Sequence, residues 1–550
     1  MKKIIQLIVI AMFPIFASAQ EAASDNGRLG GSLQSNANFF LRDPKIGAAG
    51  IPQYDHQLFG AESWLNLNYS KSGFDVGLRF DLFNNSNLLN PTGSYSAQGF
   101  GNWYIRKKVN QLDIAAGYIY DQIGSGIIFR AFEERPLAID NALLGVSAAY
   151  HLSPNWKIKG FTGKQKQQFD TYGSIVKGAA IDGFVSLGDS SHTFTLSPGI
   201  GIVNRTFDDA SVQQLTSAIG SYTPQDTIKI AYNTYAFSAY NTLTAGNFTW
   251  YVEGAFKSPD IMFDPYSSKL NFNGEYSLGK LIRKPGSVLY SSLAYSQSGF
   301  GITIEGKRTE NFKFRTNPFV TLNRGAINFL PPMARQNTYR LTARYQSATQ
   351  ELGEQSFQVD ARYKINKHLS INVNASNITT LDNVQLYREI YTELSYKQKK
   401  YSIIGGLQVQ NYNQDRYETK PGVPMVKTVT PFVEVLYKFT KKKALRLETQ
   451  YMSTSQDLGS WLFGLAEFSI APRWIFTASD MYNIKPHKIN AYTGKLEKLH
   501  YPNVGVTYIK SSNRFSLNYV KQVEGVVCTG GICRLEPAFS GVKLTVNSSF

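Results

Sequence analysis

The stretch Phe74-Asp75-Val76-Gly77-Leu78-Arg79-Phe80-Asp81-Leu82-Phe83 decides the fold of this chain of 550 residues. Large apolar residues alternate with mostly polar or small ones along it. Successive side chains of an extended strand point to opposite faces, so this period of two gives one apolar and one mostly polar face. The stretch therefore predicts a β-strand that lies between an apolar and a polar environment.

The same alternation recurs along the whole chain. Further runs include residues 112–120, 248–256, 300–304, 357–365, 369–375, 445–451 and 515–519. Many approach the length of about 9 to 11 residues that a tilted strand needs to cross a bilayer. A soluble β-sandwich shows the same alternation, but its strands are typically about 5 to 6 residues long. The run lengths therefore favour a membrane barrel.

Aromatic residues stand at the ends of many runs, as in the interfacial girdles of outer-membrane barrels. They include Tyr69, Tyr345, Tyr363, Tyr396, Tyr437, Tyr451 and Tyr482. The last run, residues 542–550, stops on Phe550, which resembles the assembly signal of bacterial outer-membrane proteins. We therefore expect contacts with outer-membrane lipid, lipopolysaccharide and the outer-membrane assembly machinery.

The N-terminus has the three parts of a secretory signal peptide. Lys2 and Lys3 precede an apolar stretch at residues 4–16 and the small-residue cleavage site Ala17-Ser18-Ala19. Residues 1–19 are thus the predicted signal peptide, and residues 20–550 the predicted barrel. Removal of the two lysines lowers the net charge from +17 to +15. Beyond the signal no run of 18 apolar residues occurs, which excludes a bundle of transmembrane helices.

The connections between the runs predict the topology. Short turns, such as residues 70–73 and 441–443, alternate with long polar loops, such as residues 42–61 and 164–178. Short connections are periplasmic and long ones extracellular in such barrels. An extra crossing within residues 309–338 gives an even number of strands. The predicted fold is all-β, a single large transmembrane antiparallel barrel of about 26 strands, within a range of about 22 to 28.

The chain has two cysteines, Cys528 and Cys533, in the last long loop. Exported proteins meet oxidising conditions, so a local disulfide that staples the loop is the favoured interpretation. A metal site is the weaker alternative, because the spacing does not suit paired cysteine ligands and no histidine lies nearby.

The most unusual local sequence is the Gly-rich stretch Asp121-Gln122-Ile123-Gly124-Ser125-Gly126. It is followed by the charged residues Arg130, Glu133, Glu134 and Arg135. A phosphate loop is disfavoured because the stretch lacks the lysine of that motif. The favoured interpretation is a loop that folds over or into the lumen with its arginines and glutamates paired, and the sharper hypothesis is a pore constriction.

No sequence pattern favours an enzyme, a metal site or a cofactor. The six histidines lack metal-ligand spacing, and no Gly-x-Ser-x-Gly nucleophile motif occurs. Sites assembled from distant loops stay open as an alternative. The basic residues are scattered rather than gathered on one face, so nucleic acid is not an expected partner.

Four segments carry a resemblance to a known family. They are Gly-Arg-Leu-Gly-Gly-Ser-Leu-Gln-Ser at residues 27–35, residues 121–135, Gln-Tyr-Met-Ser-Thr-Ser-Gln-Asp at 450–457 and Met-Tyr-Asn at 481–483. Together they resemble an uncharacterised family of outer-membrane β-barrels from Bacteroidota. The resemblance implies fold and location, and it implies no activity and no functional residue.

Two functional classes follow from a wide barrel with a polar inner face. The first is a porin-like channel or transporter for small solutes, with anions favoured by the basic lean of the inner face. The first run begins near Leu29, which leaves no room for a separate plug domain. The second is a structural or accessory barrel that works with type IX secretion or surface-protein assembly, whose secretion-system or surface proteins would be its partners.

Overall fold

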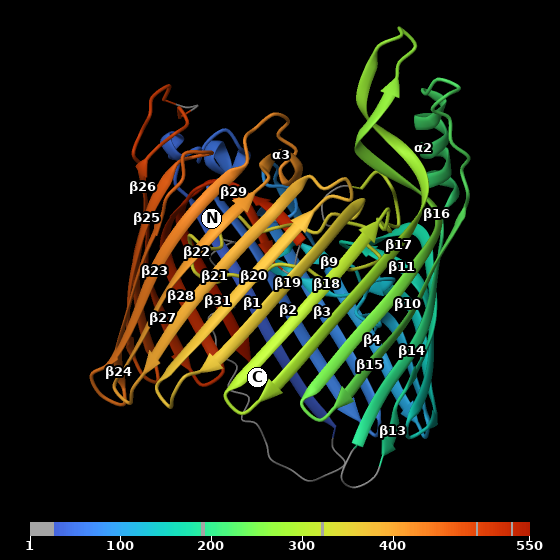
Figure 1. Cartoon of the computed structure of the whole chain (residues 1–550), viewed down its shortest axis with the longest axis horizontal. Helices are drawn as coiled ribbons and strands as arrows, with labels where there is room; N and C mark the ends of the chain where they lie inside the picture. Colours follow the sequence, from blue (N-terminus) through green and yellow to red (C-terminus); the bar gives the residue numbers. More distant parts are fainter. Residues whose placement is uncertain (1–26, 189–192, 321–323, 491–492, 530–531) are drawn as a thin grey trace.

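The computed structural model describes residues 27–188, 193–320, 324–490, 493–529 and 532–550. Within them, 24 antiparallel strands form one closed ring (Figure 1). In ring order the strands are β1 (Arg28–Phe40), β2 (Phe59–Lys71), β3 (Phe74–Ser86), β4 (Tyr95–Val109), β5 (Leu112–Ile119), β10 (Leu143–Ser153), β11 (Trp156–Gln167), β12 (Asp170–Gly183), β14 (Thr193–Thr206), β15 (Asn233–Ala245), β16 (Phe248–Leu270), β17 (Tyr276–Gln297), β18 (Phe300–Glu310), β19 (Gly353–Lys364), β20 (Leu369–Thr379), β21 (Gln385–Lys397), β22 (Tyr401–Tyr412), β23 (Val426–Lys438), β24 (Lys443–Met452), β25 (Ser460–Ile470), β26 (Trp474–Lys485), β27 (His500–Lys510), β28 (Asn513–Gln522) and β31 (Phe539–Ser549).

The first and last strands close the ring. β1 and β31 pair antiparallel, with Ser35 opposite Val546. Phe550 continues this pairing, because its backbone N–H donates to Gly31 O at 3.0 Å and its carbonyl accepts from Gly31 N at 2.8 Å. The predicted all-β barrel is confirmed. The predicted signal peptide, residues 1–19, lies outside the described residues and stays a prediction.

The alternation of the sequence sorts side chains between the outside and the inside of the ring. On β3, Leu78 and Phe80 are 40% and 38% exposed on the outer surface. Their neighbours Arg79 and Asp81 are 4% and 3% exposed and point inward. Closure of the sheet leaves no unpaired edge, which is the condition for a sheet to span a bilayer. An outward apolar band of this kind suits contact with lipid.

The strand count corrects one prediction. The ring has 24 strands, inside the expected range but two fewer than 26. The extra crossing predicted within residues 309–338 is wrong, because β18 pairs directly with β19 and Arg308 lies opposite Gln355. Residues 311–352 contain no strand within their described part. Tyr345, expected at a strand end, is instead 3% exposed inside this segment.

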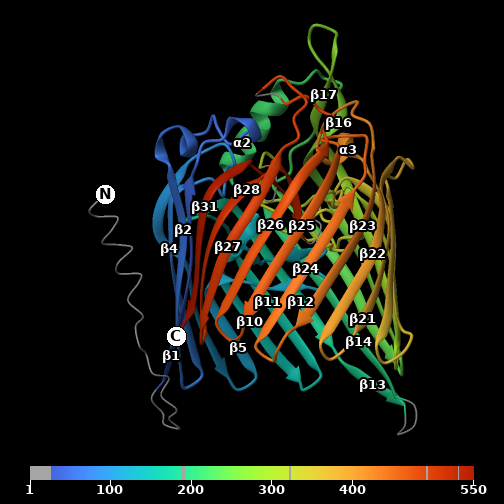
Figure 2. The same cartoon turned by 90° about the vertical axis from the view of Figure 1, so that its left-hand side faces the viewer.

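The two ends of the barrel differ (Figure 2). One end, here called the turn rim, carries short turns such as Ser72-Gly73 between β2 and β3. The other, the loop rim, carries the long connections, including η1 (Pro44–Ile46), η2 (Gln53–Gln57), α2 (Asp209–Gly220), α3 (Gln414–Tyr417) and the hairpin of β29 (Gly525–Thr529) and β30 (Ile532–Glu536). The predicted loop at residues 164–178 is mostly strand, since β11 and β12 extend to a tight turn after Gln167.

Several elements lie beside the ring rather than in it. β13 (Val185–Gly188) pairs with β14 next to β12. The outer parts of β16 and β17 rise beyond the loop rim as an arm (Figure 1), and Leu215 and Ile219 of α2 pack on Ile261 and Leu281 of the arm. No helix within the described residues is long and apolar enough to cross a membrane.

The first loop at the loop rim packs across the seam of the ring. The hydroxyl of Tyr54 in η2 accepts from Ser540 N at 3.0 Å and donates to Ala538 O at 3.2 Å. Burial raises the pKa of Tyr54 to about 12. The contacts tie the connection between β1 and β2 to the start of β31, so the closing pair of strands is held from above.

Candidate functional site

Two connections fold into the barrel instead of staying at its rim. The first plug segment, residues 120–142, joins β5 to β10 and contains β6 (Gln122–Ile123), β7 (Phe129–Arg130), β8 (Glu133–Glu134), η3 (Arg135–Leu137) and β9 (Ile139–Asp140). The second plug segment, residues 311–352, joins β18 to β19. Figure 1 shows its coil, in yellow, inside the ring of strands. The lumen is therefore occupied by parts of the chain itself.

The two plug segments bind each other. Arg130 N donates to Ile327 O at 2.9 Å, and Phe329 N donates to Gly126 O at 2.9 Å. The amide of Asn141 donates to Ala326 O at 3.0 Å. Two of these acceptors, Ile327 O and Ala326 O, belong to the coil of the second segment, and the third, Gly126 O, belongs to the first segment. The two segments thus complete each other's hydrogen bonding in the interior.

The tip of the first plug segment is apolar and packs on the barrel wall. Ile123, Ile127 and Ile128 are fully buried. They belong to one apolar cluster with Val176 and Val203 of the wall. Water is excluded from this contact, which stabilises the inserted state by the burial of apolar surface. The first segment is anchored as a packed core and not as a mobile strap.

Gly201 on β14 makes room for this tip, and its replacement tests the packing. A Cβ at Gly201 would stand 2.4 Å from Cγ2 of Ile123. We expect Gly201→Val to destabilise the barrel in urea by about 1 to 3 kcal/mol, because overpacking displaces the tip. Gly254→Val is the matched control, since a Cβ at Gly254 meets nothing within 4 Å. Equal unfolding curves for the two variants would contradict the packing.

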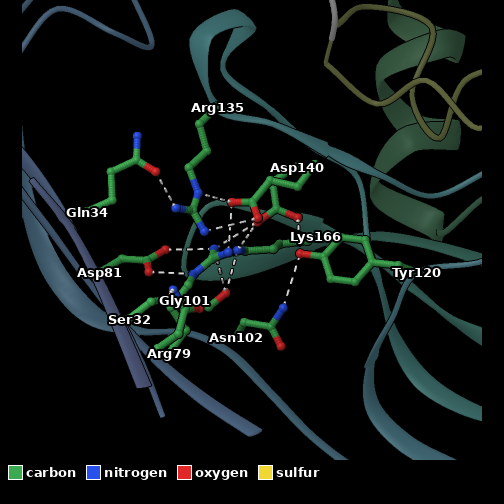
Figure 3. A network of polar contacts seen from close by, with 12 residues as sticks. Ser32, Gln34, Arg79, Asp81, Gly101, Asn102, Tyr120, Arg135, Asp140 and Lys166 are labelled. Atoms are coloured by element: carbon green, nitrogen blue, oxygen red, sulfur yellow. Dashed lines mark hydrogen bonds and ion pairs between the residues drawn. The ribbon is translucent and has the colours of Figure 1, made fainter. Parts of the chain in front are cut away.

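Below this tip, Arg79 of β3 is the centre of a charged network (Figure 3). Its guanidinium contacts Asp81 at 2.6 Å, Glu133 at 2.7 Å and Asp140 at 3.0 Å. Lys166 of β11 also contacts Asp140 and donates to Gly101 O. Buried charges persist only when partners compensate them. The network therefore fixes the first plug segment to strands β3, β4 and β11.

The polar contacts continue away from the charges. Tyr120 donates to Asp140 at 2.8 Å and accepts from the Asn102 amide at 3.1 Å. Arg135 donates to Gln34 of β1 at 2.7 Å. The contacts with Asn102 and Gln34 run from the first plug segment to side chains on the inner wall, whereas the bond between Tyr120 and Asp140 lies within the segment (Figure 3). The segment is thus held from both sides of the point where it enters the lumen.

The charged residues predicted from sequence all lie in the first plug segment. Arg135 contacts Glu133 at 2.9 Å, and its guanidinium lies 5.1 Å from the Trp64 ring. Arg130 lies over the rings of Phe132 and Phe329, at 4.7 and 4.3 Å. Glu134 pairs through its backbone with Ile139. Their role in a constriction stays a prediction.

The second plug segment is anchored on buried charges of β14 and β16. Arg205 contacts Asp260 at 2.8 Å, and Lys257 contacts the same carboxylate at 3.3 Å. Arg205 also donates to Arg315 O at 2.9 Å, and Lys257 donates to Lys313 O. All three wall side chains are at most 1% exposed. Cationic side chains of the wall thus donate hydrogen bonds to backbone carbonyls of the second plug segment.

The far end of the second plug segment meets amides of the wall. Gln408 donates to Thr342 O at 3.0 Å, and Gln410 donates to Tyr345 O at 2.6 Å. The side chain of Gln450 accepts from Leu341 N at 2.7 Å. Wall side chains from β14 through β24 therefore replace the backbone partners that a strand would have supplied.

Hollows remain beside the plug segments. A cavity of about 610 Å³ at the loop rim is lined by residues that include Arg340, Arg344 and Lys488. A cavity of about 360 Å³ near the turn rim is lined by residues that include Arg106, Lys108 and Lys157. We call them the loop-rim cavity and the turn-rim cavity. Acidic residues also line both cavities, but lysines and arginines outnumber them in each.

The remaining predicted site residues lie away from the lumen network. Cys528 and Cys533 stand opposite each other in the β29–β30 hairpin. The side chain of Cys528 lies outside the described residues, so the disulfide stays a prediction. Phe550 is 43% exposed at the turn rim, and its role in assembly stays a prediction. Within the described part of the chain, no group of three His, Cys, Asp or Glu residues is placed to hold a metal ion.

A family model matches the whole chain, residues 1–550, and is described as a family of unknown function, DUF6029. The chain belongs to this family. No curated protein matches the sequence.

Solved structures of similar shape share little sequence with this DUF6029 protein. The siderophore receptor PirA from Pseudomonas aeruginosa is 9% identical over 96% of this chain and 81% of its own, with a TM-score of 0.39. OccAB4 from Acinetobacter baumannii is 10% identical over 72% of this chain and 97% of its own, with a TM-score of 0.32. A chain of the E. coli P pilus tip assembly intermediate PapC-PapD-PapK-PapG is 9% identical over 97% of this chain and 62% of its own, with a TM-score of 0.44. No function follows from likenesses this weak.

Proposed function

We propose that this barrel lies in the outer membrane and is a channel or transporter for small solutes, with a preference for anions. The outward apolar band supports the location, together with exposed aromatics at the turn rim such as Tyr69, Tyr363 and Trp474. The turn rim then faces the periplasm and the loop rim faces outward, as short and long connections do in such barrels.

Part of the inner wall keeps polar side chains that stay partly exposed beside the plug segments, and this observation carries the proposal. The wall from β26 through β28, β31 and β1 to β2 carries mostly uncharged amides and hydroxyls, with charged exceptions such as Glu62 and Lys543. The partly exposed ones include Ser32, Asn36, Asn66, Asn518, Thr545 and Asn547. A polar and mostly uncharged wall of this kind suits hydrated solutes. The plug segments narrow the lumen, and the proposed passage follows this side.

The basic lean of both cavities supports an anion preference. Arg106, Lys108, Lys157 and Lys159 line the turn-rim cavity with Asp75, Asp113 and Asp121. The low-dielectric wall focuses the excess positive charge into the lumen and raises the local concentration of anions. The effect acts at both rims of the lumen, on either side of the plug segments.

Conductance in a planar bilayer tests the proposal. We expect ohmic steps whose reversal potential in a KCl gradient indicates anion selectivity. Lys108→Glu with Lys157→Glu should shift that potential toward cation selectivity, because the charge at the turn-rim cavity is inverted. Lys399→Glu with Lys400→Glu, in the turn between β21 and β22, is the matched control and should leave selectivity unchanged. A silent barrel that co-purifies with secretion components would overturn the proposal in favour of an accessory role.

A further inference from the structure

A third hollow, of about 100 Å³, lies above the Arg79 network, under the connection between β3 and β4. We call it the Arg324 cavity. Its apolar lining comes from three places far apart in the sequence: Phe83 on β3, Leu88 and Leu89 in the connection, and Phe169 at the β11–β12 turn. A cavity of about 150 Å³ lined by Leu, Ile and Phe binds benzene. The Arg324 cavity has about two thirds of that volume and a similar apolar lining, so a single aromatic ring is the largest apolar group that it suits.

The charges around this cavity do not cancel. Arg79, Arg135, Lys166 and Arg324 line it together with three carboxylates, those of Asp81, Glu133 and Asp140. The first three cations pair with these carboxylates. Among the described residues, no ion pair includes Arg324, whose Nη2 donates to Leu89 O at 2.6 Å. One positive charge is left at the edge of an apolar hollow.

This combination limits the ligand to one chemical class. A ring fills the apolar part, and a single negative charge balances Arg324 through a charge-assisted hydrogen bond. A dianion such as a phosphate monoester would carry a surplus charge beside the carboxylates of Glu133 and Asp140. A neutral ring would leave the guanidinium without a counter-ion. The ligand that matches both features is a small aromatic carboxylate.

We propose that the Arg324 cavity binds a small aromatic carboxylate, with the ring among Phe83, Leu89 and Phe169 and the carboxylate on Arg324. Leu88, Leu89 and Phe169 of its lining belong to loop-rim connections, so the cavity lies near the end of the barrel that carries the long loops. A small aromatic carboxylate would then be the solute class of the proposed channel. Only its passage through the barrel rests on the proposed function. Binding itself is a separate property of the barrel.

Ligand-observed NMR titration of the purified full-length barrel in detergent, with benzoate as the probe, tests the site. We expect saturable binding of benzoate and binding of benzamide, its neutral counterpart, that is weaker by about tenfold or more. Arg324→Gln should lower the affinity for benzoate by about tenfold or more and leave the affinity for benzamide unchanged. Phe169→Ala should weaken both probes, because it removes ring contact. Arg388→Gln, an exposed arginine on β21, is the matched control.

Two outcomes would overturn the site: no saturable binding of benzoate, or equal benzoate affinity for Arg324→Gln and Arg388→Gln. Circular dichroism of each variant verifies that the barrel is folded. Conductance measurements separate the two proposals. Benzoate binding by a barrel that never conducts keeps the site and removes the channel, whereas conductance without benzoate binding keeps the channel and removes the site.

Discussion

Replacing Arg79 with glutamine should loosen the first plug segment and raise the conductance of the barrel. Arg79 is 4% exposed and compensates three carboxylates at once. Its loss leaves Asp81 buried without its ion-pair partner, a defect that costs about 3 to 5 kcal/mol, and removes one of the two cations that contact Glu133. The strain acts where residues 120–142 meet the wall, so release of the segment relieves it. Single-channel conductance in a planar bilayer and hydrogen exchange of residues 120–142 measure the effect.

Arg362→Gln is the matched control for this experiment. Arg362 also stands at an inward-facing position, on β19, but its side chain is 71% exposed and lies 3.5 Å from Asp360. Exposed pairs of this kind contribute about 0 to 1 kcal/mol. Unchanged exchange of residues 120–142 in Arg79→Gln, with conductance equal to that of Arg362→Gln, would show that the network does not hold the segment.

The fold follows from the sequence wherever a strand separates lipid from lumen. Leu78 faces outward and Arg79 faces inward, and the alternation of apolar and polar residues predicts these opposite orientations. Residues 339–345 show the limit of the rule. Tyr339, Leu341, Ala343 and Tyr345 alternate with polar residues as a strand would. Yet Leu341 and Thr342, on opposite sides of that pattern, are both buried at 1% or less. A coil buried on all sides imitates the alternation, and this produced the surplus strands.

The site was only partly predictable. Glu133 and Arg135 stand two positions apart, so their pairing is visible in the local sequence. The partners Arg79 and Asp140 are separated by 61 positions, and only closure of the ring brings them together. No pattern in the sequence around Lys166 indicates that it is the second cation that contacts Asp140. Inward-facing charges were identified, but their partners depend on which loop enters the lumen, and that depends on packing between distant segments.

Wall side chains decide where a plug segment can lie in the lumen. A coil placed in a lumen needs a hydrogen-bond partner for each buried backbone group. The wall from β11 through β24 supplies such partners through cations and amides such as Lys257 and Gln408. The wall around β1 and β31 carries mainly shorter polar side chains, among them Ser32 and Thr545, although Gln34 accepts from Arg135. The passage that we propose would therefore run along the strands with the shorter polar side chains.

The second large effect is expected from Asp260→Asn on β16. The carboxylate of Asp260 is 1% exposed and accepts from Arg205 at 2.8 Å, from Lys257 at 3.3 Å and from Thr234 Oγ1 at 3.0 Å. An asparagine keeps the shape and removes the charge, which leaves two buried cations side by side. We expect a loss of about 3 to 5 kcal/mol in the free energy of unfolding, measured by urea titration in detergent.

The same substitution should act on the second plug segment, because the two cations hold its first residues. Arg205 donates to Arg315 O and Lys257 donates to Lys313 O, so repulsion between them withdraws both donors from the coil. Limited proteolysis within residues 311–352 should accelerate. Asp264→Asn is the matched control. Asp264 lies on the same strand and accepts from its near neighbours Tyr266 N and Ser267 Oγ, and its replacement should cost about 1 kcal/mol or less. Equal stability and equal cleavage in the two variants would mean that the wall charges do not anchor the segment, and the apolar tip at Ile123 would then carry the insertion alone.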